Sequence, residues 1–332
     1  MTATPVSTDP IGRPGPSLLL RLVELACTAP STHNSQPWRW RLLDDGVELH
    51  TDPERRLRSI DPDDRDLVIS CGAALHCAVV AARALGWDCE VSRAPYDGRG
   101  TLLARLRLSL RREWNAEGET ALATLRARVT DRRRFTSWPV PSARLASLVR
   151  IARAHGARAR VIDDAVARFR LERLVARAQK LQEADPAAMA EQRRWVGDRP
   201  CDGVPLQVVP AADPGRPVRF GPGLLDEPDR DVRGTDGVMV LGGAGDDDDL
   251  PAAWLRTGEA LSALWLTATA EGLSVVPLSQ PIEVAETRRT LRDAVLGGEF
   301  APHLLVRLGW QAIGRSEIPH TPRRPVEDVL LP

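Results

Sequence analysis

The hydrophobic positions of the chain follow two periods, one typical of helices and the other of strands. A helical period begins at Ser17, a suitable capping residue, and continues to Ala26. A second, longer helix is predicted from the acidic stretch 61–66 to Gly86, a typical helix end. Between these helices, the alternation in 38–43 and 47–50 predicts a hairpin around Asp45-Gly46. Two further strands should follow Gly86, the second over 101–110.

The same order of patterns returns in the second part of the chain. The spacing of 19–26 recurs in 145–152, that of 38–45 in 157–164, and that of 72–86 in 258–272. The run 304–308 then echoes 102–106. Four matches in one order predict an internal duplication. The alternative is coincidence among helices rich in Leu, Ala and Arg.

The two copies differ in ways that bear on function. The first has seven extra residues between its first helix and first strand, and these form the loop 29–37. The second has an arginine cluster at 128–134, where the first has only Arg13, and a long insertion at about 165–235. An insertion of this length is usually a lid, an arm or a surface excursion. We therefore expect a flexible arm (1–16), a first repeat (17–115) and a second repeat (116–332) with this insertion as a lid, and 112–120 as a linker.

Composition narrows the function classes. Lys+Arg and Asp+Glu both number 45, which argues against a general nucleic-acid binder. Five cysteines without a Cys-x-x-Cys pair, and an N-terminus without a signal pattern, favour a cytoplasmic protein. The apolar run 67–85 is long enough to span a membrane, but its polar residues favour a buried helix and no membrane partner. The histidines show no metal-ligand spacing, and no dinucleotide fingerprint is present; Asp236-Gly237 and Gly242-Gly243 are interpreted as loops.

The loop 29–37 is the first candidate site. Two prolines, Pro30 and Pro37, enclose small hydrogen-bonding residues and exclude a regular helix or strand. A polar loop with local turns is the structural alternative. The order of Pro30, Ser31, Asn34, Gln36, Pro37 and Trp38 closely resembles the FMN-contacting loop of nitroreductase-family flavoproteins.

Two further motifs carry the same resemblance. Arg128, Thr130 and Arg132 resemble the family's contact with the FMN phosphate and the flavin, and guanidinium groups pair well with phosphate. The stretch from Gly272 through Pro277, Leu278, Ser279 and Gln280 resembles the turn whose backbone N–H groups lie near flavin N5, with Ser279 on the N5 side. Arg323, or Arg324 as its substitute, matches a C-terminal phosphate contact. The sequence departs from the family pattern at Val129, Gln280 and Thr321.

The resemblance implies an α+β fold of nitroreductase type, in which the two repeats form a fused pseudo-dimer. Family members are usually homodimers whose two FMN sites take parts from both subunits. In this chain each repeat retains a different part, so one FMN site per chain is expected; a monomer could supply it, and a further homodimer stays open.

The duplicated organisation with a long insertion resembles the Acg family of actinobacterial dormancy-associated flavoproteins. The preferred function is an FMN-dependent two-electron oxidoreductase with NAD(P)H as candidate donor, acting in ping-pong order on a small-molecule acceptor. In that case no protein nucleophile is required. The alternatives are an Acg-type protein that sequesters FMN under a closed lid, and a flavin oxidase of natural-product maturation.

Overall fold

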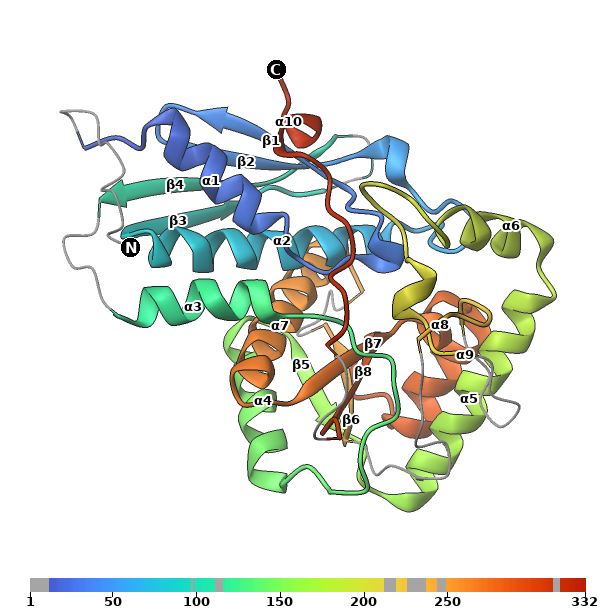
Figure 1. The fold of residues 1–332 in the computed structure, drawn as a ribbon. Helices are drawn as coiled ribbons and strands as arrows, with labels where there is room; N and C mark the ends of the chain where they lie inside the picture. The colour runs from blue at the N-terminus through green and yellow to red at the C-terminus, as the bar shows by residue number, and fades with distance from the viewer. Residues whose placement is uncertain are drawn as a thin grey trace.

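The computed structural model describes residues 12–96, 98, 100–110, 116–211, 219–225, 237–243, 249–312 and 317–332. The fold is α+β: two antiparallel sheets are separated and flanked by helices, as expected (Figure 1). The N-terminal part contains α1 (Pro16–Ala26), η1 (Thr32–Asn34), β1 (Trp38–Leu43), β2 (Gly46–Thr51), η2 (Pro53–Arg55), α2 (Arg65–Ala84), β3 (Trp87–Arg93), β4 (Leu102–Leu110) and α3 (Ala116–Ala127).

The remaining described elements belong to the second part of the chain. They are α4 (Ser142–Ala154), β5 (Arg158–Val161), α5 (Ala165–Glu183), α6 (Pro186–Arg194), η3 (Leu206–Val208), β6 (Gly237–Gly242), α7 (Pro251–Ala270), β7 (Ser274–Leu278), α8 (Gln280–Glu283), α9 (Ala285–Thr290), the π-helical turn η4 (Leu291–Val295), β8 (Pro302–Gly309) and α10 (Val326–Val329).

The two sheets have the same topology, which agrees with the expected repeat. Their strand orders are β1-β2-β4-β3 and β5-β6-β8-β7, and every neighbouring pair is antiparallel. Each has a register shift at the same place, at Leu49/His50 in β2 and at Leu241/Gly242 in β6. Relative to these shifts, Ala104 of β4 and Leu304 of β8 occupy equivalent positions in the two sheets. The predicted match of 102–106 with 304–308 is therefore displaced by two residues.

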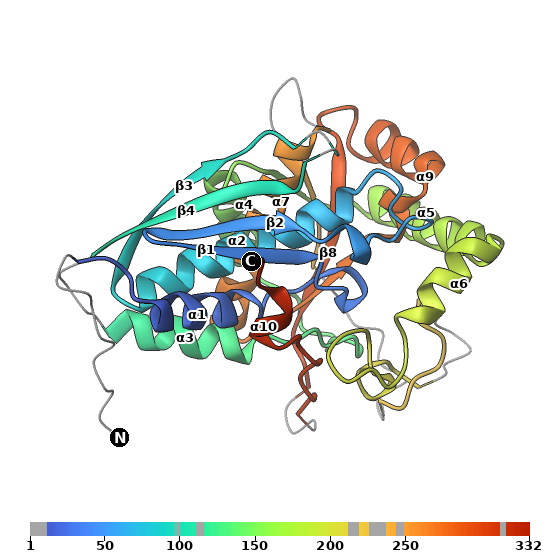
Figure 2. The same cartoon turned by 90° about the horizontal axis from the view of Figure 1, so that it is seen from above.

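The helices α2 and α7 form the centre of the molecule. Figure 1 shows the first sheet above α2 and the second below it, and Figure 2 shows α2 running under the first sheet. Where the helices cross, a Cβ on Gly258 would lie 2.0 Å from the Ile69 carbonyl oxygen and 2.8 Å from the Cα of Gly72. A Cβ on Gly72 would lie 2.1 Å from the Leu255 carbonyl oxygen. Two facing glycines therefore allow the backbones to approach this closely.

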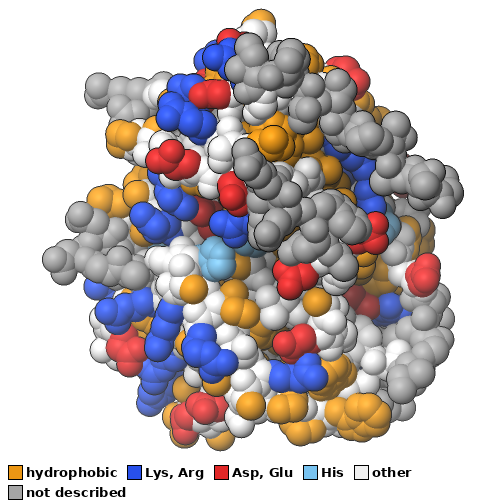
Figure 3. Space-filling view, turned by 90° about the vertical axis from the view of Figure 1, so that its left-hand side faces the viewer, with side chains coloured by type: hydrophobic (Ala, Val, Ile, Leu, Met, Phe, Trp, Pro, Cys, Tyr) orange, Lys and Arg blue, Asp and Glu red, His pale blue; other side chains and the backbone are white. Residues whose placement is uncertain are grey.

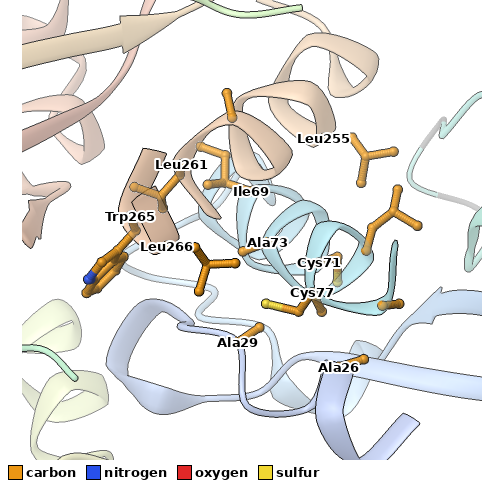
Figure 4. Close-up of a cluster of buried hydrophobic side chains, with 14 of the residues drawn as sticks. Ala26, Ala29, Ile69, Cys71, Ala73, Cys77, Leu255, Leu261, Trp265 and Leu266 are labelled. Atoms are coloured by element: carbon orange, nitrogen blue, oxygen red, sulfur yellow. The ribbon is translucent and has the colours of Figure 1, made fainter. Parts of the chain in front are cut away.

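One continuous core surrounds this crossing. Figure 4 shows Ile69, Ala73 and Cys77 of α2 between Leu261, Trp265 and Leu266 of α7 and Ala26 and Ala29 near the end of α1. The apolar length of Arg65–Ala84 would suffice for a membrane span, but 83% of its most apolar window is buried in the protein, as the sequence predicted for a core helix. A second, smaller cluster lies between the other face of the second sheet and α5, α8 and η4.

Several local predictions are confirmed. The helices α2 and α7 end just before Gly86 and Gly272, and both glycines have positive φ, at 87° and 78°. The residue types at these ends match a left-handed C-terminal cap. The α1 helix, however, has Gly15 as its N-cap and begins at Pro16, so the capping role predicted for Ser17 is wrong.

Two segments interpreted as irregular are regular elements. Residues 116–120 of the predicted linker begin α3, which packs on α2 so closely that a Cβ on Gly118 would lie 2.9 Å from the Ala84 carbonyl oxygen. Gly237 and Gly242 are the two ends of the central strand β6. Gly242 is required there because a Cβ would lie 2.1 Å from the Ala301 carbonyl oxygen. Residues 1–11 of the predicted arm and 212–218 and 226–236 of the insertion lie outside the described residues.

The exposed surface matches the balanced charge of the sequence. On the face in Figure 3, basic and acidic side chains lie among one another and among hydrophobic ones.

The glycine contact yields a stability prediction. Gly258→Ala should lower the free energy of unfolding by about 1–3 kcal/mol, because the new methyl group must push the two central helices apart. Urea unfolding followed by circular dichroism measures this change. Gly100→Ala is the matched control, since a Cβ there meets no atom within 4 Å. Equal midpoints for both variants would contradict the proposed role of the crossing.

Candidate functional site

The loop between α1 and β1 is held in an unusual backbone conformation. His33, Asn34 and Gln36 have positive φ values of 53°, 52° and 50°. Such residues cost about 1–3 kcal/mol each and persist only where surrounding contacts enforce them. Here Ser31 Oγ accepts from Gln36 N at 2.9 Å, and Ser70 Oγ of α2 accepts from Thr32 N at 3.2 Å.

Asn34 and Gln36 fasten distant segments to this loop. Asn34 Nδ2 donates to the carbonyl oxygens of Gly203 and Pro322, both at 2.9 Å. Gln36 Nε2 donates to the Cys201 carbonyl oxygen at 2.9 Å, and Gln36 Oε1 accepts from Arg324 N at 2.9 Å. The loop therefore joins the insertion and the C-terminal segment to the first half. In this arrangement Asn34 and Gln36 act by positioning other groups.

A narrow cavity of about 40 Å³ lies beside the loop and collects the predicted basic residues. Arg128, Arg132 and Arg323 line it, together with the other predicted residues Pro30, Ser31, Asn34 and Thr130. Among the described residues that line it there is no Asp or Glu. The motif residues, which are far apart in the sequence, thus meet around one small positively charged space.

Of the three arginines of this cavity, Arg128 is buried, and Arg132 and Arg323 are half-buried. Burial lowers the pKa of Arg128 and of Arg132 to about 10. Burial, followed by repulsion from Arg128, lowers the pKa of Arg323 to about 9. All three remain protonated at neutral pH. Positive charge that gathers around a cavity without a described lining carboxylate is costly, so the cavity favours an anion.

Protein contacts orient two of these groups. Arg323 donates to the Cys27 and Thr28 carbonyl oxygens at 3.0 and 3.1 Å and to Asn34 Oδ1 at 3.1 Å. Arg128 donates to the Thr28 carbonyl oxygen at 3.0 Å, and its guanidinium carbon lies 4.7 Å from the ring centroid of Trp265. Its Nη1 is buried with no hydrogen-bond partner. An anion in the cavity would supply the missing acceptor.

Arg324 has a different environment from Arg323. It lines neither this cavity nor the larger one described below. Its Nη1 lies 3.1 Å from Asp52 Oδ2, and its Nη2 donates to the Asp328 carbonyl oxygen at 2.6 Å. The charge of Arg324 is thus compensated within the protein, and of the two predicted alternatives Arg323 is the one that faces the cavity.

A second cavity of about 870 Å³ adjoins the first and shares Pro30, Ser31, Thr130 and Arg132 with it. This volume lies near the upper end of the range for small-molecule sites. The predicted turn residues Pro277, Leu278, Ser279 and Gln280 line it from β7 and α8. Ile69 and Ser70 of α2 and Leu261 and Trp265 of α7 line it from the central helices. Of the thirteen predicted FMN-contact residues, eleven line one or both of these cavities, and Gln36 and Arg324 line neither.

The insertion forms part of the wall of this large cavity. The helix α5 contributes residues at helical spacing, including Leu171, Val175 and Gln179. Arg219 reaches across to the predicted turn, where Nη1 donates to Ser279 Oγ at 2.8 Å and Nη2 lies 2.5 Å from Glu283 Oε1. Phe220 contacts the ring of His33 edge to face, with centroids 5.3 Å apart. The described part of the insertion therefore enters the candidate site.

The sequence analysis did not identify His33 and Asp66, two titratable residues that line the large cavity, as site residues. His33 is buried, neither ring nitrogen has a hydrogen-bond partner, and burial followed by Arg219 and Arg132 lowers its pKa well below its usual value. Asp66 is also buried, and burial followed by Asp61 and Glu283 raises its pKa well above its usual value. His33 occupies an unassigned position of the loop motif. Asp66 was attributed only to the helix dipole.

The corresponding place in the other half of the molecule is filled by an ion pair. In the first sheet Val91 lies opposite Leu106, and at the equivalent place in the second sheet Pro277 lies opposite Val306. Two residues further along each strand, Arg93 therefore takes the position of Ser279. Arg93 binds Glu259 of α7 through two hydrogen bonds, from Nε at 2.8 Å and from Nη2 at 2.6 Å. A bidentate pair of this kind fills the space at the strand end. The two halves therefore share a topology but differ in their sites.

Comparisons with known proteins place the chain in a family. No family model matches it. The "Putative NAD(P)H nitroreductase Rv3131" of Mycobacterium tuberculosis is 38% identical over 314 residues, which cover 93% of this chain and 90% of that protein. The "Putative NAD(P)H nitroreductase acg" of the same species is 34% identical over 343 residues, which cover 99% of this chain and 98% of that protein.

Solved structures show a more distant likeness. The nitroreductase with bound FMN from Bacteroides fragilis has 15% identity and a TM-score of 0.38, and covers 60% of this chain and 92% of its own. The FMN-dependent nitroreductase NfnB from Mycobacterium smegmatis in complex with NADPH has 15% identity and a TM-score of 0.36. That match covers 64% of this chain and 97% of the NfnB chain. Likeness at this level carries no argument about the site. Relatives at 38% and 34% identity over nearly the full chain show that the chain belongs to the NAD(P)H nitroreductase family that includes Rv3131 and acg.

Proposed function

We propose that this protein binds FMN across the two cavities and acts as an NAD(P)H-dependent two-electron oxidoreductase. The observation that carries the proposal is the narrow cavity, which three arginines and no described carboxylate line. It adjoins a larger, partly apolar cavity. A phosphate at one end and a flat aromatic group at the other would match these two environments.

The residues at the narrow end fit a phosphate group. Arg128 and Arg323 would contact it, with Arg132 and Thr130 between the cavities. The unpartnered Nη1 of Arg128 supplies a donor that the protein itself does not use. The small volume of this end favours a terminal phosphate over a larger dinucleotide, so FMN is preferred to FAD.

The large cavity would receive the ring system. FMN supplies hydride chemistry when bound, and the protein supplies orientation and electrostatics. The end of β7 would place the backbone of Ser279 and Gln280 toward the redox-active nitrogen, and Arg219 fixes the Ser279 hydroxyl. NAD(P)H as the donor rests on the names of the relatives, which are NAD(P)H nitroreductases. The second substrate would be a small-molecule acceptor.

FMN sequestration is the second candidate function, and the position of Phe220 favours it. Phe220 lines the large cavity, contacts His33, and lies 5.2 Å from the guanidinium carbon of Arg132. An aromatic side chain there would compete with a nicotinamide for space. In that case, the insertion from about 165 to 235 acts as a closed lid over the flavin.

The cysteines bear on where in the cell the protein is located. All five cysteines are free thiols, which supports a cytoplasmic protein. Both parts of the candidate site come from one chain, so a monomer would be competent. The paired topology supports a fused pseudo-dimer that arose by duplication.

The first experiment separates the two functions. Anaerobic stopped-flow mixing of the FMN-loaded protein with NADH or NADPH should bleach the flavin absorbance if the cavity admits nicotinamide. Phe220→Ala should accelerate bleaching if this side chain obstructs access. An unchanged oxidised spectrum in both proteins would contradict the oxidoreductase and favour sequestration.

Removal of a single guanidinium should weaken FMN binding. Arg128→Ala and Arg323→Ala should each reduce affinity about ten- to a hundredfold, which corresponds to a charged hydrogen bond of about 1.5–3 kcal/mol. Fluorescence titration of the apoprotein with FMN measures this loss. Arg323→Lys should fall between wild type and Ala, because it keeps the charge and loses the fork. Arg13→Ala, at an exposed arginine, is the control; equal losses in all variants would refute the assignment.

The number of flavins per chain tests the asymmetry of the halves. Because Arg93 and Glu259 fill the place that corresponds to the Ser279 turn, at most one FMN should bind per chain. Absorbance of released flavin against quantitative amino-acid analysis gives the ratio. Asn34→Ala and Arg132→Ala should each lower affinity at that one site. Two FMN per chain would show that the second half-site is functional.

A further inference from the structure

Two carboxylic side chains line the large cavity, the exposed Glu172 of α5 and the buried Asp66, and flavin binding does not require Asp66. Asp66 lies in the first turn of α2, is 3% exposed and lines the cavity. Its Oδ2 is buried and has no hydrogen-bond partner. A buried polar oxygen that faces a ligand cavity without a partner is a candidate ligand contact.

The surroundings of Asp66 contain more negative than available positive charge. Asp61 precedes the helix, and its Oδ2 accepts from Leu67 N at 2.9 Å. Glu283 of α8 faces the same region and is paired with Arg219 of the insertion. Arg65 is directed to Asp249, at 3.3 Å. Both nearby arginines thus have other carboxylate partners.

These surroundings raise the pKa of the Asp66 carboxyl group. Burial is the largest cause of its raised pKa, followed by the charges of Asp61 and Glu283; Arg219 and Arg65 oppose the shift. Burial likewise raises the pKa of Asp61, to about 7. A protonated carboxyl group is a hydrogen-bond donor as well as a proton source.

Asp66 also lies on the side of the cavity where the chemistry of the proposed function would occur. Arg219 connects Ser279, the predicted residue beside the flavin's reactive nitrogen, with Glu283, a neighbour of Asp66. Ser70 links the helix to the loop, because its Oγ donates to the Asp66 carbonyl oxygen at 2.6 Å and accepts from Thr32 N. The offset of 186 positions that relates Gly72 to Gly258 relates Asp66 to Ala252, so the other half has no equivalent acid.

We propose that Asp66 is the proton donor to the electron acceptor that binds in this cavity. The inference rests on the proposed oxidoreductase function and adds a catalytic residue to it. A quinone serves as the example. The reduced cofactor would supply a hydride to it. Asp66 supplies one proton, which becomes bonded to a quinone oxygen as the Asp66 O–H bond breaks. The products are a hydroquinone and the Asp66 carboxylate, which regains a proton from water.

His33 is less suited to this role. Its pKa is lowered, so it carries no extra proton at neutral pH. As a neutral imidazole it can donate or accept a hydrogen bond to a ligand. The two residues therefore predict different pH profiles when each is changed.

The protonation state can be measured without flavin. Isotope-edited infrared spectroscopy of the apoprotein at pH 7 should show a protonated carboxyl band that is absent from Asp66→Asn. Asp63→Asn is the matched control, since Asp63 lies near the same helix start and its side chain is 55% exposed. Absence of a band that depends on Asp66 would overturn the proposal and leave FMN binding unaffected.

The rate of acceptor reduction tests the proton transfer. The protein is loaded with FMN, reduced with dithionite and mixed anaerobically with benzoquinone. Asp66→Asn should slow flavin reoxidation about 10²-fold or more and remove its solvent deuterium isotope effect. FMN affinity and reduction by NADPH should stay near wild-type values. Equal reoxidation rates and isotope effects would overturn the proposal.

The wild-type pH profile guards against an effect of misfolding. Reoxidation should slow as pH rises through the value at which the infrared band disappears, because the donor then lacks its proton. A flat profile across that value would overturn the proposal. Failure of the wild-type apoprotein to bind FMN would refute the proposed function, an outcome distinct from a missing infrared band.

Discussion

The contact between Gly72 and Gly258 determines how the two halves of this molecule fit together. Because neither residue has a side chain, the backbones of α2 and α7 can come into direct contact where the helices cross. Each sheet packs against the central layer that these helices form. The ligand cavity is lined by both of these helices, through Ile69 and Ser70 on one and Leu261 and Trp265 on the other. The width of the candidate site thus depends on a contact within the core.

Around this fixed centre, buried charge is treated in two ways. At the narrow cavity, Arg128 and Arg323 hold positive charge against backbone carbonyl oxygens, without a carboxylate among the described lining residues. At the position of the first sheet that corresponds to Ser279, Arg93 is neutralised by Glu259. Buried positive charge is therefore left for an external anion at one place and is neutralised within the protein at the other. A shared fold does not by itself provide two sites.

The parts that the sequence predicts well are those set by local rules. Glycine ends two helices because only it adopts their left-handed caps easily, and Pro30 and Pro37 enclose an irregular loop. The strand β6 was missed because its terminal glycines, needed for close packing, imitate a turn. Phe220 and Asp66 were missed as site residues because their neighbours lie far away in the sequence. Gln36 and Arg324 match a motif, yet their side chains bind each other's segments, a choice that depends on tertiary contacts.

The path of the last residues has a consequence for the order of folding during synthesis. Residues 318–321 and Arg323 line the narrow cavity, and the chain then reaches β1, where Leu331 N donates to the Trp40 carbonyl oxygen at 2.7 Å (Figure 1). Nearly three hundred residues separate Arg323 from its partner Cys27. The first sheet, which ends at Leu110, can form long before that segment is synthesised, but the anion pocket is complete only once the segment has left the ribosome. Under the proposed function, cofactor capture is thus a late event in the synthesis of the chain.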